Sequence, residues 1–154
     1  MRVILAIGIL LALASPPPRP RYTTLVIQYS GEVIGGPALP VVITTSQEEG
    51  EWYRQHVLPE LSGSFATVKV LPQTVFNEIT ELPLLKRALE KAMPVADEPK
   101  TNQNVRFITG VGHDHWEIIL DKRPSMKILK GIDRIVAKYP SLASELQELE
   151  YQLR

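Results

Sequence analysis

The sequence predicts an α+β domain, with a largely antiparallel sheet of about five to six strands and helices packed on at least one face. Short β-branched and aromatic runs, bounded by glycine and proline, are interspersed with segments whose apolar residues recur every three to four positions. Two such runs, near residues 105–111 and 116–120, lie close enough together to form a hairpin. Two helical patterns follow one another at the end of the chain. This order differs from the regular strand and helix alternation of a parallel sheet.

The composition limits the classes of protein and partner. The chain has 154 residues, 44% of them hydrophobic, with 17 basic and 17 acidic residues and no cysteine. This length supports one domain with its own core. Balanced charge gives no electrostatic argument for binding nucleic acid or an anionic membrane surface. Without cysteine the fold has no disulfides, which suits a periplasmic setting better than a harsher extracellular one.

The first residues have the pattern of a secretory signal peptide. Arg2 precedes an unbroken apolar run from Val3 to Leu13, and Ala12-Leu13-Ala14 supplies a cleavage site. We therefore expect residues 1–14 to be a signal peptide, residues 15–21 a proline-rich tether and residues 22–154 a single exported domain. A membrane span needs about 20 apolar residues, so an uncleaved anchor is the alternative.

The next segments predict strands and helices in turn. β-branched runs predict strands at residues 23–30 and 39–45. Ser46 is a suitable N-cap for a helix that runs to about Leu58, where Pro59 breaks the last turn. Residues 64–71 are expected to form a third strand, Thr74 to cap a short helix, and Pro83 to begin another helix that ends near Met93. Residues 94–104 bury almost nothing and predict a surface loop.

The hairpin pattern predicts a register. If Gly112-His113-Asp114-His115 is a four-residue connection, Val111 lies opposite Trp116 and Phe107 opposite Leu120. Both histidines then lie at the tip of the loop. A further strand at residues 126–130 and two closing helices, with apolar stripes at 132–139 and 142–153, complete the prediction.

The hairpin tip is also the best candidate site. Two imidazoles two residues apart, flanked by carboxylates, can contact a ligand, and an aromatic side chain off the packing stripe of its helix can mark an interface. The predicted binding residues are His113, Asp114, His115, Trp116 and Trp52.

A metal site is the alternative interpretation of the same residues. His113, His115 and Glu117 offer the nitrogen and oxygen ligands that zinc accepts. If Glu117 is not a ligand, a third group must come from elsewhere, and His56 is the remaining histidine. The ordinary interpretation is a polar turn with no ligand, because Gly, His and Asp are all common in turns.

The function that follows is an exported, non-enzymatic binding or accessory domain that contacts a protein or small molecule, with no cofactor. The chain has no Gly-x-Ser-x-Gly elbow and no thiol nucleophile. Two alternatives stay open: a small metal-dependent hydrolase that uses His113 and His115, and a membrane-tethered subunit of an envelope assembly. The prediction includes no nucleic-acid partner and, after signal cleavage, no membrane contact.

Overall fold

A computed structural model describes residues 22–29, 32–33, 36–37, 40–94, 104–137, 146–151 and 153. The expected signal peptide and tether lie outside these residues, as do most of the predicted 94–104 loop and residues 138–145. The strands are β1 Thr24–Tyr29, β2 Glu32–Val33, β3 Gly36–Pro37, β4 Val41–Thr44, β5 Thr67–Val70, β6 Met93–Pro94, β7 Val105–Val111 and β8 Asp114–Leu120. The helices are α2 Gln47–His56, α3 Glu60–Phe65, α4 Gln73–Thr80, α5 Pro83–Leu89 and α6 Lys122–Ile135, followed by a short helical segment at residues 146–151.

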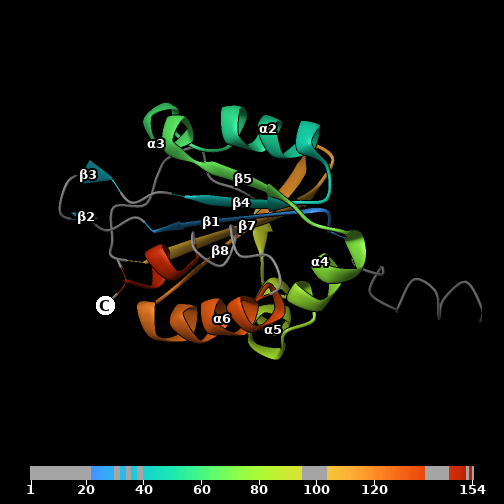
Figure 1. The fold of residues 1–154 in the computed structure, drawn as a ribbon, viewed down its shortest axis with the longest axis vertical. Coiled ribbons are helices and arrows are strands. Elements are labelled where there is room, and N and C mark those ends of the chain that lie inside the picture. The colour runs from blue at the N-terminus through green and yellow to red at the C-terminus, as the bar shows by residue number, and fades with distance from the viewer. Residues whose placement is uncertain are drawn as a thin grey trace, which may run out of the picture.

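The sheet confirms the predicted α+β class. Among the described residues, six strands form one sheet in the order β5-β4-β1-β7-β8-β6, and β2 pairs with β3 separately. Only the β4 and β5 pair is parallel. Figure 1 shows α2 and α3 on one face of the sheet and α4, α5 and α6 on the other. The helices thus cover both faces.

The alternation of side chains along β1 sorts the core into two clusters. Leu25 and Ile27 point into a large apolar cluster with α4, α5, α6 and residues 146–153. Val26 points the other way, into a small cluster with Val42, Ile108, Tyr53 and Leu58 beneath α2. Because successive residues of a strand face opposite sides, β1 is buried on both faces.

Three predictions about the elements are wrong. The helix that begins at Pro83 ends at Leu89 and not near Met93, which lies in β6. Residues 126–130 are not a strand: they belong to α6, which buries Ser125, Ile128, Leu129 and Ile132 at helical spacing. Pro124 lies in the first turn of this helix, where its missing N–H costs no hydrogen bond. Thr74 does not cap α4, because Pro72 holds the N-cap position.

The predicted hairpin exists, but with a shorter turn and a different register. Gly112 and His113 alone form the turn, and Asp114 and His115 already belong to β8. Gly112 has φ of +57°, the only positive value at a described residue, which permits a two-residue turn. The pairs are Thr109 with Trp116 and Phe107 with Ile118, two residues away from the expected register, so each side chain keeps its predicted face.

Candidate functional site

Trp52 on α2 lies against the β7 to β8 turn, and three histidines surround it. Its ring is stacked on that of His113, with centroids 3.9 Å apart and planes 6° apart. His56, one helical turn along α2, stacks at 5.0 Å, and His115 meets the indole edge-on at 5.9 Å. The sequence has three histidines, so all of them contact one half-buried indole. We call Trp52, His56, His113 and His115 the Trp52 cluster.

Glu49 attaches the turn to α2. One of its carboxylate oxygens accepts a hydrogen bond from the backbone N–H of Gly112 at 2.6 Å. The other accepts from the hydroxyls of Thr23, at 2.6 Å, and Thr24. Ser46 caps the helix by accepting from the N–H of Glu49, so Glu49 is in the first turn, next to the strand ends. The carboxylate therefore joins α2, the start of β1 and the hairpin turn.

Tyr53 holds the base of the same hairpin. Its ring is fully buried, and its hydroxyl donates to the backbone carbonyl of Asp114 at 3.1 Å. Burial, and then the charges of Glu49 and Asp114, raise the pKa of the Tyr53 phenol above its ordinary value, so it remains a neutral donor. A Cβ on Gly110 would overlap the Tyr53 hydroxyl, which is why glycine occupies that position of β7.

Hydrogen bonds fix the chemistry of two of the imidazoles. The Nδ1 of His115 lies 2.7 Å from the carbonyl oxygen of His113, and the Nδ1 of His56 lies 3.1 Å from that of Trp52. A carbonyl oxygen only accepts, so each Nδ1 carries the hydrogen and donates. In a neutral ring this leaves Nε2 as an acceptor for a ligand.

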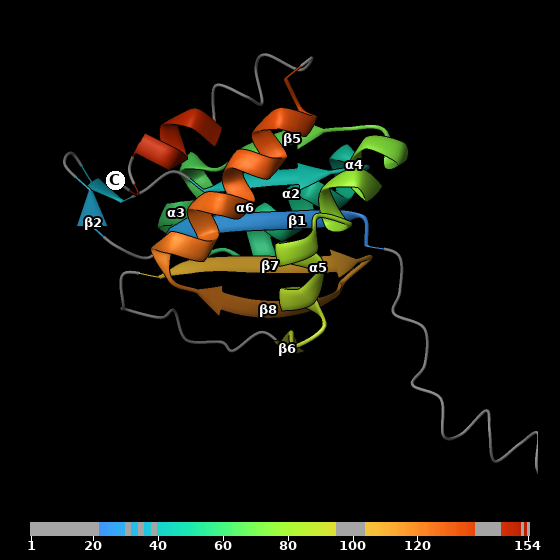
Figure 2. The same ribbon diagram turned by 90° about the horizontal axis from the view of Figure 1, so that it is seen from below.

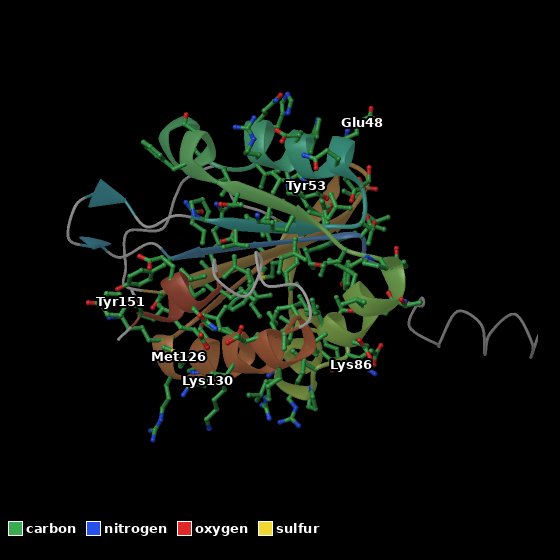
Figure 3. The ribbon with its side chains drawn as sticks, in the orientation of Figure 1. Glu48, Tyr53, Lys86, Met126, Lys130 and Tyr151 are labelled. Atoms are coloured by element: carbon green, nitrogen blue, oxygen red, sulfur yellow. The ribbon has the colours of Figure 1, made fainter. Side chains whose placement is uncertain are left out.

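An open cleft of about 500 Å³ adjoins the cluster. It is lined by Ser46, Glu48, Glu49, Glu51, Trp52, Gln55, Gly112 and His113. Arg54 neutralises Glu51 in part, with Nε 2.7 Å from the carboxylate, and Glu49 is bonded as described above. Glu48 is exposed on the outer side of α2 (Figure 3). The cleft thus combines an indole with carboxylates and contains no Lys or Arg in its lining.

Known proteins provide no further guide to this site. No family model, curated protein or solved structure matches the chain. In the part of the chain that the structure describes, no helix has both the length and the apolar character needed to span a bilayer.

The structure divides the predicted site residues between two faces. Trp52, His113 and His115 come together. Asp114 lies at the exposed start of β8 and contributes its carbonyl oxygen to Tyr53. Trp116 lies on the opposite face of the sheet, edge-on to Tyr22 at 5.9 Å. It cannot share a binding surface with the histidines, because neighbouring residues of a strand face opposite sides.

The described residues give no support to the metal interpretation. Glu117 shares a face with His115, but its side chain is buried and forms an ion pair with Arg106 at 3.1 Å. Within the described ranges, no group of three His, Cys, Asp or Glu residues is arranged to hold a metal ion. The three predicted ligands are thus not gathered around one point.

Sequence reasoning missed the two residues that hold the site together. Glu49 lies in the acidic first turn of α2, where a carboxylate also favours the helix dipole, and Tyr53 lies on the buried side of the helix, so neither residue stands out by its local pattern. A signal for Tyr53 exists, because a buried tyrosine hydroxyl needs a hydrogen-bond partner. No local pattern points from Glu49 to Gly112, which is 63 positions away along the chain.

Proposed function

We propose that this protein is an exported accessory domain that binds a basic segment of a partner protein at the Trp52 cluster and the adjoining cleft. The observation that carries the proposal is the stack of the half-buried Trp52 indole on the exposed His113 ring at the rim of a carboxylate-lined cleft. The aromatic rings of the cluster present π electrons to guanidinium and ammonium groups, and neighbouring carboxylates add ionic attraction. Arginine and lysine side chains meet both requirements.

The rigidity of the site supports a role in binding. Glu49 and Tyr53 hold the turn against α2 through contacts that leave the outer edge of the cluster open to solvent. A surface held in place loses little conformational freedom when a partner docks. His56 and His113 are exposed, which makes them accessible to a partner as well.

Fluorescence of Trp52 provides the direct test. Trp116→Phe removes the second indole from the far face of the sheet and makes Trp52 the sole Trp reporter. In this background, an arginine-rich peptide should change the emission in a saturable way, and an acidic peptide of equal length should not. Glu48→Gln combined with Glu51→Gln should weaken binding by about fivefold, the scale of exposed charge pairs.

A matched control separates local from general electrostatics. Glu78, which is exposed on α4 in the opposite layer, is replaced by Gln, and this variant should bind the peptide like its parent. Equal weakening by Glu78→Gln, or no response to the arginine-rich peptide, would contradict the proposed site.

Capture of a natural partner gives a second test. Trp52→Ala and His113→Ala should each reduce what the protein retains from a cell-envelope extract, whereas Trp116→Phe should not. Mass spectrometry of the N-terminus tests export: cleavage after Ala14 is expected, and an intact apolar segment on the native protein would instead favour the membrane-tethered alternative.

A further inference from the structure

The outer face of α6 carries a row of cations. Arg123, Lys127, Lys130 and Arg134 are all exposed, at positions four, seven and eleven residues after the first. At 3.6 residues per turn these positions lie within about 40° of Arg123, and they span about 16 Å along the axis. Among the described residues, no carboxylate lies within ion-pair distance of any of the four.

The neighbouring helix extends this basic row into a face. α5 packs beside α6. Leu82, the residue before α5, lies against Gly131 of α6: a Cβ added to Gly131 would be 3.2 Å from the methyl groups of Leu82. Figure 2 shows α5 and α6 beside each other, and Arg87 on α5 and Lys91 just after it are exposed. Lys86 is exposed too, but it pairs with Glu81 at 2.9 Å. Figure 3 shows Lys86 and Lys130 on the same side of the molecule, which is opposite to Glu48.

Few acidic groups offset these charges. The 14 residues of α6 include five basic residues and one acid, the half-buried Asp133. Glu90, just after α5, and Asp121, the N-cap residue of α6, are exposed and add two more carboxylates, and Glu81 is paired with Lys86. The zero net charge of the chain therefore conceals one acidic side and one basic side. The expectation of no membrane contact was based on the net charge alone, without the distribution of the charges.

We infer that the α5 and α6 face docks on the anionic headgroups of a phospholipid bilayer. The cations stand on the convex outer side of a helix whose apolar side is already buried in the core, so they form an open array and not a pocket. A continuous plane of negative charge matches such an array, and each basic residue near it strengthens binding by about fivefold. The exposed positions of α6 carry no aromatic side chain on which a nucleic-acid base could stack.

The docked orientation leaves the other side of the molecule free. Figure 1 shows α2 and α6 in opposite layers, with the sheet between them. With α6 against lipid headgroups, α2 and its cleft point away from the bilayer. The inference does not depend on what the cleft binds.

Co-sedimentation of the full chain with vesicles tests the inference. The protein should bind vesicles of phosphatidylcholine and phosphatidylglycerol in equal amounts more tightly than vesicles of phosphatidylcholine alone. The comparison between the two vesicles matters because an apolar N-terminal segment would bind either one. Raising the salt concentration should remove the difference, since salt screens exposed charges.

Paired variants test the residues themselves. Lys127→Gln with Lys130→Gln should weaken binding to the anionic vesicles by about tenfold or more. Lys127→Arg with Lys130→Arg preserves the charge and should bind as the parent does. Lys69→Gln on β5 removes a cation on another element and should have no comparable effect. Circular dichroism verifies that each variant is folded.

Three results would overturn the inference. One is equal binding of the parent protein to both kinds of vesicle. Another is undiminished binding of the Lys127 and Lys130 glutamine variant to the anionic vesicles. The third is binding to single-stranded DNA or an acidic peptide without binding to anionic vesicles, which would assign the face to another class of partner.

Discussion

The helices on the two sides of the sheet contact it in different ways. On the α4, α5 and α6 side, the described residues form one large cluster of 22 buried apolar side chains. On the α2 side the corresponding cluster has five, and directed polar contacts surround it. These contacts are the bonds to Glu49, the hydroxyl of Tyr53 and the ion pair of Arg106 with Glu117. One side thus fixes the fold by bulk packing, and the other fixes individual groups in defined places.

The outward surfaces of the two sides differ as well. α2 presents carboxylates and an aromatic cluster beside a cleft, and α6 presents a row of cations. Directed bonds are needed on the α2 side because stacked rings must meet at a set distance and angle. A charged row requires only that its helix be held, for which apolar packing suffices. The side of the domain that is held by directed bonds is therefore also the side with the aromatic and carboxylate surface.

Loss of the buried ion pair between Arg106 and Glu117 should lower the stability of the protein more than any other change proposed for the two sides. Arg106→Met leaves the Glu117 carboxylate buried beside an apolar side chain, which should lower the free energy of unfolding by about 3 to 5 kcal/mol. Ile128→Val, which removes one methyl group from the large cluster, should cost about 0.5 to 1.5 kcal/mol. Urea denaturation measures both. Equal losses of unfolding free energy would show that the polar contacts on the α2 side are no more sensitive to substitution than the apolar contacts of the large cluster.

Substitution of Glu49 should have the next largest effect. In Glu49→Gln one carboxylate oxygen becomes an NH2 group, which cannot accept a hydrogen bond, so either Gly112 or the Thr23 and Thr24 pair loses its acceptor. The expected cost is about 1 to 3 kcal/mol. Glu48→Gln, one residue earlier and exposed, should change stability by less than about 0.5 kcal/mol.

Hydrogen exchange locates this effect. The amide of Gly112 should exchange faster in Glu49→Gln than in the parent, because its acceptor is lost or rearranged. The same amide in Glu48→Gln should be unchanged. Unaltered protection of Gly112 in both variants would mean that Glu49 does not hold the turn in solution.

Local sequence patterns predicted the helices and strands whose start or spacing is set by residues within the element or next to it. Ser46 and the pattern after it placed α2, Pro83 placed the start of α5, and the alternation of residues 105–120 placed both strands of the hairpin. Residues 126–130 failed because Met126, Ile128 and Lys130 also suit a strand. The helical period of three to four residues, to which Leu129 and Ile132 belong, becomes visible only when residues 122–135 are considered as one segment.

The site was only half predictable for a related reason. A short motif identified His113 and His115, but their neighbours Trp52 and His56 come from a helix more than 50 positions earlier in the chain. A sequence pattern contains no information on such a distance. The register error also came from the turn, since Gly112 allows a two-residue connection where four residues were expected.

Removal of the Tyr53 hydroxyl should have the smallest effect on stability, and it tests a single hydrogen bond on the α2 side of the sheet. Tyr53→Phe removes the hydrogen bond to Asp114 and should lower stability by about 0.5 to 1.5 kcal/mol near neutral pH. Burial raises the pKa of this phenol in the folded protein, whereas in the unfolded chain it titrates near its ordinary value of about 10. As the pH rises past that value the unfolded state alone loses the proton, so alkali favours unfolding of the parent protein.

The difference in stability between the parent and Tyr53→Phe should therefore shrink between about pH 8 and about pH 11. Urea denaturation at each pH measures it, with Tyr151→Phe as the matched control, because that ring is 71% exposed. The control should show no such convergence with its parent. A constant difference for Tyr53→Phe would mean that its phenol ionises as readily in the folded as in the unfolded state, which the buried contact with Asp114 does not allow.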